Sequence, residues 1–587
     1  MNRQLDVAAR AIAIALTAVL ADGSTATFTP SNVSTSGVYY FNSATGNDAN
    51  DCRSTANACK TIAKAMLHTY APGEKLLFVG SFAGNVTMTP KTVPSLGDPA
   101  KPIIIGSMDP ANRATITAKV GGETGIVQIS GVSGVTVTDL ILRGPATATA
   151  GTMPRGGVMV QNPSSRQIRG LIIRNSDIGG IAWYEASRNR SDPNIQGGFG
   201  ANIFIEGWPG TGGISDVLIE NNDVHGLNGV TSYDDTGIAG FGGQPITNII
   251  VRGNRVYDIG GGPPGLPPGR AYPPMGDGIQ ANGWSNVLIE HNVVHDVGAN
   301  MKNCGGPAGI LTINVDGALI QLNEVYNVQP APRYDNGCDW IGIDLDNNTI
   351  NSVVQYNYTH DSFNSGLYIF DVSGTANNLT LRYNISENDN WGGYLGFGAI
   401  AISVSGAPNL YIYGNTTFNN RTYSGPLYQN ADQGAAAFSI AGNGNFGGLI
   451  ANNLFIVGPM NDGACGGFMA RVYQPGWNPP VNIKNNHFHC VGGWRWEGFW
   501  RNDFLSGQDF SSIAAASSKF QSTTTGDPMI TAGGIGPNGY VLKRGSPIIG
   551  AGTDYRPLVP SPPTADYFGN SISAGAPNIG ADAAAHR

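Results

Sequence analysis

Charged side chains are scarce in this chain: Asp, Glu, Lys and Arg make up only 13% of its 587 residues. Long Leu/Ala/Glu/Lys-rich runs, typical of surface helices, are missing, which disfavours a helical fold. Basic residues are also in deficit, with 33 Lys and Arg against 41 Asp and Glu and a net charge of −8. Nucleic acids and anionic membranes attract basic surfaces, so neither is expected as a partner.

No segment beyond the N-terminus is apolar and long enough to suggest a membrane span. Residues 1–21 have the pattern of a signal peptide: Arg3 and Arg10 precede a short apolar run, and Val19 and Ala21 suit a cleavage site. The run is too short to cross a bilayer. We therefore expect a secreted protein, either extracellular or periplasmic.

Cysteine is also rare. The six cysteines form three pairs that are local in sequence, Cys52/Cys59, Cys304/Cys338 and Cys465/Cys490. None has the spacing of a zinc finger, and no Cys-His set indicates a nucleophile. Disulfides in these pairs would fit an oxidising compartment; six unrelated buried thiols are the alternative.

Glycine, with 83 residues, and short Val/Ile/Leu runs are abundant, which favours strands. A phrase of the form apolar-x-apolar-x-x-Asn recurs through the chain. Its Asn residues are Asn222, Asn254, Asn292, Asn323, Asn357, Asn384, Asn415, Asn453 and Asn486. The residue three positions before each Asn is aliphatic and is expected to point inward. The Asn amides are expected to stack from one coil to the next.

A second phrase, Gly-Ile-x-apolar, precedes many of the Asn phrases, as in 278–281, 309–312 and 342–345. Two or three short strands per repeat, stacked in parallel, predict a parallel β-helix. The coils are too short for propeller blades, and the Leu frame of leucine-rich repeats is missing. We assign residues 22–119 to a lead-in and an N-terminal cap with a helix over 60–68, 120–490 to the coils, and 491–587 to an irregular covering tail.

Three motifs carry a family resemblance. They are Tyr-Phe-Asn…Gly-Asn-Asp…Lys-Thr-Ile-Ala-Lys-Ala near the N-terminus, Gly-Ser-Pro-Ile-Ile-Gly-Ala-Gly…Asp-Tyr-Phe-Gly-Asn in the tail, and Asp344-Leu-Asp-Asn…Gln-Tyr-Asn-Tyr-Thr-His-Asp361 in the middle. They resemble secreted right-handed parallel β-helix proteins of the pectate-lyase-like superfamily. The resemblance implies a single-stranded right-handed solenoid that acts on carbohydrate. That superfamily includes lyases, hydrolases, epimerases and phage depolymerases, so fold alone does not give the activity.

Asp344 and Asp346 stand out because the neighbouring coils have no carboxylate at either place. On one strand they would both point outward, roughly 6.5–7 Å apart. Asp371 lies near them on the next coil. Two carboxylates in a groove are the usual requirement for glycoside hydrolysis, and the wider same-strand separation suits an inverting site. We predict that the catalytic residues come from this set; turns, caps or calcium ligation are the structural alternative.

The residues around these carboxylates are candidates for substrate binding. His360 and Glu387 belong to a His/Tyr-rich column three residues after the Asn, whose alternative role is ring stacking at a corner. Lys302 and Arg333 lie in loops that lead into the strands, and Trp340 and Tyr368 could stack on sugars. The full candidate set is Asp277, Gln280, Asn282, Lys302, Arg333, Trp340, His360, Tyr368 and Glu387.

The sequence therefore predicts a secreted glycoside hydrolase that acts on an extracellular polysaccharide or oligosaccharide. A polysaccharide lyase that uses Lys302, Arg333 or His360 is the first alternative, and a non-enzymatic carbohydrate-binding or adhesion protein is the second. No cofactor is required, although the acidic cluster leaves open a structural or catalytic calcium ion.

Overall fold

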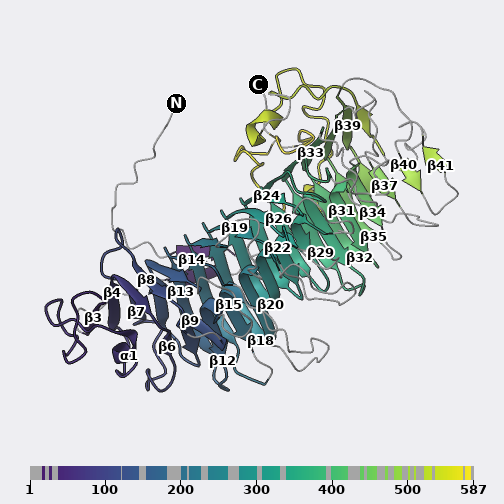
Figure 1. Ribbon diagram of the computed structural model, residues 1–587. Coiled ribbons are helices and arrows are strands. Elements are labelled where there is room, and N and C mark those ends of the chain that lie inside the picture. Colours follow the sequence, from purple (N-terminus) through teal and green to yellow (C-terminus); the bar gives the residue numbers. More distant parts are fainter. Residues whose placement is uncertain are drawn as a thin grey trace.

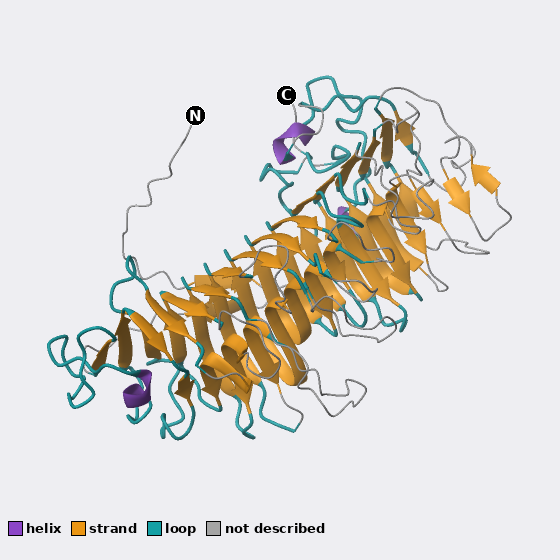
Figure 2. Cartoon of the chain, viewed as in Figure 1, coloured by secondary structure: helices purple, strands orange, loops and turns teal. Residues whose placement is uncertain are grey.

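The chain folds into a right-handed parallel β-helix, as predicted (Figure 1). Each coil has up to three strands, and equivalent strands of successive coils pair in parallel (Figure 2). The computed structural model describes residues 16–19, 25–28, 37–119, 122–144, 154–181, 200–207, 210–226, 236–261, 276–300, 307–330, 339–391, 398–420, 436–441, 446–458, 470–472, 482–491, 500–502, 508–510, 521–531, 536–572 and 575–583.

The first strand of the coils forms what we call the first sheet. Its strands are β6 (Val86–Met88), β9 (Gly122–Ser130), β12 (Pro154–Asn162), β15 (Ala201–Gly207), β18 (Thr236–Arg252), β20 (Asp277–Glu290), β22 (Ala308–Ile313), β25 (Ile341–Leu345), β28 (Leu367–Asp371), β31 (Gly398–Val404), β34 (Ala436–Ala441), β37 (Ala470–Val472) and β40 (Trp500–Asn502).

The second sheet joins the first because β18 and β20 run through both. It contains β3 (Val38–Asn42), β4 (Lys75–Val79), β7 (Ile103–Ser107), β10 (Val135–Thr138), β13 (Ile168–Arg174), β16 (Ile214–Glu220), β23 (Asp316–Gln321), β26 (Ile350–Gln355), β29 (Asn377–Arg382), β32 (Ala407–Tyr413), β35 (Phe446–Ala451) and β38 (Asn482–Lys484).

The third sheet is separate and contains β5 (Ser81–Ala83), β8 (Ala114–Thr117), β11 (Leu140–Arg143), β14 (Asp177–Gly179), β17 (Asp223–His225), β19 (Arg255–Ile259), β21 (Val293–Val297), β24 (Glu324–Val328), β27 (Tyr358–His360), β30 (Ile385–Glu387), β33 (Thr416–Asn419), β36 (Leu454–Val457), β39 (His487–Cys490) and β42 (Thr524–Thr525). Two pairings are antiparallel, β1 (Leu16–Val19) with β2 (Thr25–Phe28) and β40 with β41 (Gln508–Phe510).

The N-terminal cap differs from its prediction in where the coils begin. β3 pairs in parallel with β4, and β4 with β7, so stacking starts well before residue 120. The predicted helix is a single turn, α1 (Ile62–Ala65), capped by the Thr61 hydroxyl, which accepts from the Lys64 N–H. The Cys52–Cys59 disulfide is confirmed. Cys490 is also disulfide-bonded, whereas Cys304, Cys338 and Cys465 lie outside the described residues.

The predicted Asn ladder runs through the wall of the solenoid. Each Asn from Asn222 to Asn453 donates its backbone N–H and its Nδ2 to the Oδ1 of the Asn in the next coil. All of these distances are 2.9–3.0 Å. The same Nδ2 also donates to a carbonyl of the preceding coil, as from Asn357 to Ile320 at 2.9 Å. These amides are buried, so the ladder satisfies groups that water cannot reach.

The interior is a continuous stack of aliphatic side chains. Ile219, Val251, Ile289, Ile320 and Val354, from the column predicted to point inward, all have no exposed surface. This burial is the main driving force that closes each coil.

The C-terminal tail packs along the side of the last coils (Figure 1). Tyr540, Leu542 and Ile548 lie against Phe418 and Ile456 of the third sheet. Near the corner with the second sheet, the Tyr555 hydroxyl bonds that of Tyr383 at 2.7 Å. The tail therefore covers one side of the C-terminal coils. Within the described parts of the chain, no helix is long and apolar enough to cross a membrane.

Asn357→Ala is predicted to lower the free energy of unfolding by about 3 kcal/mol. The substitution leaves buried amide and carbonyl groups in the coils on both sides without their hydrogen-bond partners. Urea unfolding followed by circular dichroism measures the loss. Asn409→Ala is the matched control, since Asn409 bonds Asn377 on the exposed surface and should change stability by less than about 0.5 kcal/mol. Equal losses in the two variants would contradict a structural role for the ladder.

Candidate functional site

Asp344 lies on the outer face of β25, in a column that is apolar on both sides. Its register partners are Leu311 in the preceding coil and Tyr368 in the next. These two residues, with Ala308, Ile341 and Ala401, form an apolar cluster on the outside of the first sheet. Asp344 is 7% exposed, and its Oδ1 has no hydrogen-bond partner. Burial, followed by the charges of Asp346 and Asp339, raises the pKa of Asp344 well above its usual range.

Asp346 follows β25 directly and is half-buried. Its backbone N–H donates to the Thr312 carbonyl at 2.8 Å, which ties it to the preceding coil. Its Oδ1 accepts from Asn347, from the backbone N–H at 2.5 Å and from Nδ2 at 2.6 Å. Burial and the charge of Asp339 outweigh these hydrogen bonds and raise the pKa of Asp346 to about 6.

Asp277, at the start of β20, has no exposed surface. Its Oδ1 accepts from the Ala308 N–H at 2.7 Å, while its Oδ2 has no partner. Burial, and then the charges of Asp339 and Asp346, raise the pKa of Asp277 to about 7. Asp277 was predicted only as a binding residue, and the structure places it within the electrostatic reach of the other carboxylates.

Asp339 is the member of this cluster that the sequence interpretation missed. It is half-buried, and its charge contributes to the raised pKa of Asp277, Asp344 and Asp346. A signal was available: Asp339 stands two residues before β25, close to the start of its coil's first strand, and Asp277 is the first residue of β20. We call Asp277, Asp339, Asp344 and Asp346 the acidic cluster.

The acidic cluster has two levels. Asp277 and Asp344 are buried, whereas Asp339 and Asp346 are only half-buried and can meet a ligand. Like charges that are close together cannot all ionise at neutral pH, which leaves protons on some of these carboxyl groups. The arrangement can therefore hold a protonated and an ionised carboxyl group within one electrostatically coupled cluster.

Trp340 holds the backbone beside Asp339. Its φ of 66° is unusual for a bulky residue. Its N–H donates to Pro307 and its Nε1 to Gly298, both at 2.9 Å. The Asn364 N–H donates to the Trp340 carbonyl at 3.1 Å, and the Asn364 Nδ2 to that of Asp339. Trp340 has no exposed surface, so the prediction that it stacks on a sugar is corrected: it positions the chain.

Asp371, predicted as a catalytic partner, belongs to a turn. Its Oδ1 accepts from the Ser373 N–H at 2.8 Å and from the Ser373 hydroxyl. Its Oδ2 accepts from Thr375 at 3.2 Å and from the Ala376 N–H. Burial opposes ionisation, but these hydrogen bonds outweigh it and lower the pKa of Asp371. Both carboxylate oxygens of Asp371 already accept hydrogen bonds from its own turn, so Asp371 caps the loop after β28. This is the structural role given above as the alternative to catalysis.

His360 and Glu387 lie on the third sheet, so they do not line the face that carries Asp344. His360 ends a stack of rings with His225, Tyr257, His295 and Tyr326, with centroids 4.7–5.2 Å apart. Burial opposes its protonation, yet the hydrogen bond to Asp361 and the ion pair with Glu324 raise its pKa to about 9. These contacts correct the predicted substrate-binding role of His360: it belongs to a corner stack.

Glu387 is covered by the tail. Its Oε2 accepts from the Tyr358 hydroxyl at 2.8 Å and from the Gly536 N–H at 2.9 Å. It therefore fixes the tail to the coils, which corrects its predicted binding role.

The remaining predicted binding residues divide by position. Gln280 and Tyr368 share the column of Asp344. Asn282 is half-buried, and its Oδ1 accepts from the Asn314 Nδ2 at 3.2 Å in a surface amide row. Lys302 and Arg333 lie outside the described residues. Their roles stay predictions.

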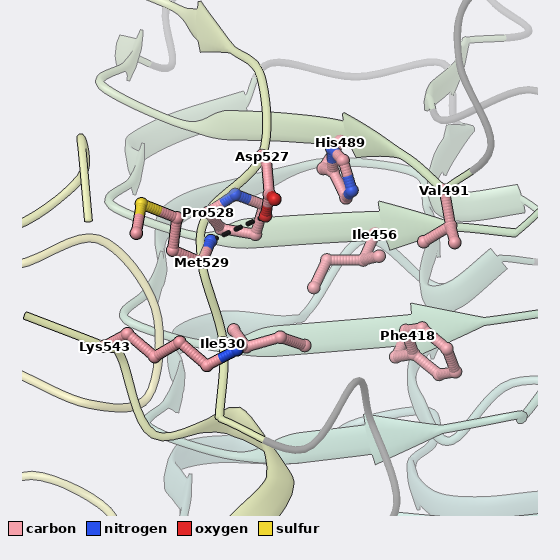
Figure 3. A pocket seen from close by; sticks show the side chains of 9 residues that line it. All are labelled: Phe418, Ile456, His489, Val491, Asp527, Pro528, Met529, Ile530 and Lys543. Carbon is pink, nitrogen blue, oxygen red and sulfur yellow. Dashed lines mark hydrogen bonds between the residues drawn. The ribbon is translucent and has the colours of Figure 1, made fainter. Parts of the chain in front are cut away.

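A cavity of about 340 Å³ lies elsewhere, between the third sheet and the tail (Figure 3). Its lining is mostly apolar and consists of Phe418, Ile456, His489, Val491, Asp527, Pro528, Met529, Ile530 and Lys543. Asp527 Oδ1 accepts from the Met529 N–H at 2.7 Å. No member of the acidic cluster contributes to this cavity.

In the described part of the chain, the ligand atoms of three His, Cys, Asp or Glu residues converge within 4.8 Å only at Cys52, Cys59 and His68. The first two form the disulfide. The calcium ion that the sequence left open stays a prediction.

Known proteins resemble this chain over part of its length. No family model matches the sequence. A stretch of 235 residues is 29% identical to lacto-N-biosidase of Bifidobacterium longum subsp. longum and covers 38% of this chain, but only 12% of that protein.

Two solved structures are similar in shape. GH136 lacto-N-biosidase from Eubacterium ramulus has 19% identity and a TM-score of 0.47, over 70% of this chain and 66% of that one. Pectate lyase Pel9A has 15% identity and a TM-score of 0.40, over 94% and 97% of the two chains.

Asp277→Asn is predicted to stabilise the protein at pH 8 by up to about 4 kcal/mol and to leave it nearly unchanged at pH 4. The pKa of Asp277 is about 7 in the folded state, above its ordinary value of 3.8. The folded protein thus holds this proton more tightly, and wild-type stability falls as the pH rises from about 4 to 7. Thermal unfolding at both pH values measures the difference.

Asp371→Asn is the control of opposite sign, because the pKa of Asp371 is lowered on folding. It should destabilise the protein at pH 8, by an amount that shrinks as the pH falls below about 4. Stabilisation by both variants at pH 8 would contradict the electrostatics of the acidic cluster.

Proposed function

We propose that this chain is a glycoside hydrolase that cleaves an oligosaccharide or polysaccharide at the acidic cluster. The observation that carries the proposal is the two-level arrangement, with half-buried Asp339 and Asp346 beside buried Asp277 and Asp344. Glycoside hydrolysis needs one protonated and one ionised carboxyl group at the scissile bond. The similarity to lacto-N-biosidase supports this reaction class and makes a lacto-N-bioside the first substrate to test.

Asp339 and Asp346 form the reacting pair in this proposal. A group that donates a proton to the leaving oxygen, or that attacks the sugar or activates water, must reach the substrate. The exposure of Asp339 and Asp346 meets that condition better than the predicted pair of Asp344 and Asp346, because Asp344 is almost fully buried. Either residue can act as the acid, with the other as nucleophile or base.

Asp344 and Asp277 lie deeper in the protein than the reacting pair and support it. Burial raises the pKa of both groups, which favours their protonated form and reduces the number of negative charges held together. Protonated carboxyl groups there can also donate hydrogen bonds to the reacting pair or to the sugar.

Asp339→Asn and Asp346→Asn are each expected to lower kcat at least about 1,000-fold on an aryl lacto-N-bioside or on the substrate found in a glycan panel. Asp344→Asn should stay within about tenfold of the wild type, because Asn resembles the protonated acid in shape and charge. Steady-state kinetics measure all three, and thermal unfolding verifies that each variant folds.

A larger loss in Asp344→Asn than in Asp339→Asn would reject the proposed pair. Product analysis decides the reaction class, since hydrolysis yields a new reducing end. An unsaturated uronide with ultraviolet absorbance would identify a lyase instead, and binding without cleavage would identify a carbohydrate-binding protein.

We also propose that the protein is exported. The Cys52–Cys59 disulfide supports an oxidising compartment. The expected mature protein begins at Asp22 and is found outside the cytoplasm, as N-terminal sequencing of fractionated cells can measure. A cytoplasmic protein that retains residues 1–21 would contradict export.

A further inference from the structure

Three buried polar side chains on the first sheet lack hydrogen-bond partners on the N-terminal side of the acidic cluster. Gln280 has no exposed surface, and neither its Nε2 nor its Oε1 has a partner within the described structure. The same holds for the Thr236 hydroxyl and for the Asp277 Oδ2. Buried polar groups are normally paired, so each of these atoms keeps an unused capacity to form a hydrogen bond.

The three groups are neighbours on the first sheet, and Asp277 among them is electrostatically coupled to Asp339 and Asp346. Thr236 and Asp277 are register partners on β18 and β20, and Gln280 follows Asp277 by three residues. The equivalent positions of the next coil, Ala308 and Leu311, belong to one outward cluster, so Asp277 and Gln280 share the outer face. Gln280 lies two coils, roughly 10 Å, from Asp344 along the axis.

The unpaired state of Gln280 is specific to its place. Gln128 occupies the same column further toward the N-terminus and is also buried. Its Oε1 accepts from the Gly125 N–H at 2.9 Å, and its Nε2 donates to the Gln161 Oε1 at 2.8 Å. The column can therefore satisfy a glutamine, as it does at Gln128, whereas Gln280, nearer the acidic cluster, is left unpaired within the described structure.

We infer that Thr236, Asp277 and Gln280 form a subsite that binds a neutral, hydroxyl-rich sugar unit of the glycan, on the N-terminal side of Asp339 and Asp346. A hydroxyl and a primary amide both donate and accept, which matches sugar hydroxyls. The carboxyl groups of the cluster would repel a uronate. On the C-terminal side, the same column continues with Tyr368 and Ala401, which are buried and apolar, so its unpaired amide lies on the N-terminal side.

This inference rests on the proposed function for the identity of the ligand, but its first test does not depend on catalysis. Gln280→Met removes the unpaired amide with little change in shape, and Met159 shows that this column accepts methionine. We expect the unfolding temperature to rise by about 1–2 °C. Gln128→Met, the matched control, breaks two hydrogen bonds and should lower it.

The second test measures affinity in the Asp346→Asn background, by calorimetry with lacto-N-biose as the neutral probe and digalacturonate as the anionic one. Adding Gln280→Met is expected to weaken lacto-N-biose binding at least tenfold, and digalacturonate is expected to bind more weakly than lacto-N-biose throughout. Tighter binding of digalacturonate, or no binding of lacto-N-biose, would overturn the neutral-sugar assignment.

The outcomes separate this inference from the hydrolase proposal. If the wild type cleaves no glycoside but Gln280→Met both stabilises the protein and weakens lacto-N-biose binding, the subsite stands and the hydrolase assignment fails. If Gln280→Met destabilises the protein as much as Gln128→Met, the subsite is rejected whatever the activity.

Discussion

The hydrogen-bonded stack of asparagines is the constraint on which the rest of the molecule depends. At the corner between the second and third sheets, the residue before each Asn has a positive φ, including Leu322, Tyr356 and Tyr383. This conformation is unfavourable for such side chains by roughly 1–2 kcal/mol each. The buried Asn next to it offsets that strain by bonding to the coil above and to the coil below. Every coil thus turns at the same point, which keeps the outer columns in register.

Because the coils are held in a fixed register, a residue that breaks the pattern of its column marks a local change in function or structure. The column of Asp344 is occupied by Leu311 and Tyr368 in adjacent coils, so the carboxyl group sits among apolar neighbours. That setting, together with the other carboxylates, produces the raised pKa values. The site therefore works against the stability of the coils that carry it, as the unpaired atoms of Gln280 and Asp277 also do. The uniform scaffold on both sides compensates for this local cost.

Periodicity made the fold and the rough location of the site predictable from sequence. The inward aliphatic column, the Asn ladder and the outward direction of Asp344 all follow from strand alternation and repeat spacing. The sequence could not predict how deeply each side chain is buried or which contacts it makes. Trp340 looks like a sugar platform in the sequence, yet it is buried against Phe363 from the next coil. Asp339 joins the cluster through a backbone conformation at Trp340, and Asp371 is saturated by its own turn; neither leaves a periodic signal.

The ladder also explains how one scaffold can host different chemistries. Successive asparagines are separated by as few as 27 and as many as 38 residues, yet their amide contacts stay at 2.9–3.0 Å. The number of residues between two successive asparagines therefore does not affect the hydrogen-bond geometry of the ladder. Loops can grow, shrink or be exchanged at the outer face with only a slow rise in closure entropy. Such a protein can acquire new substrate walls by insertion while its coils remain aligned.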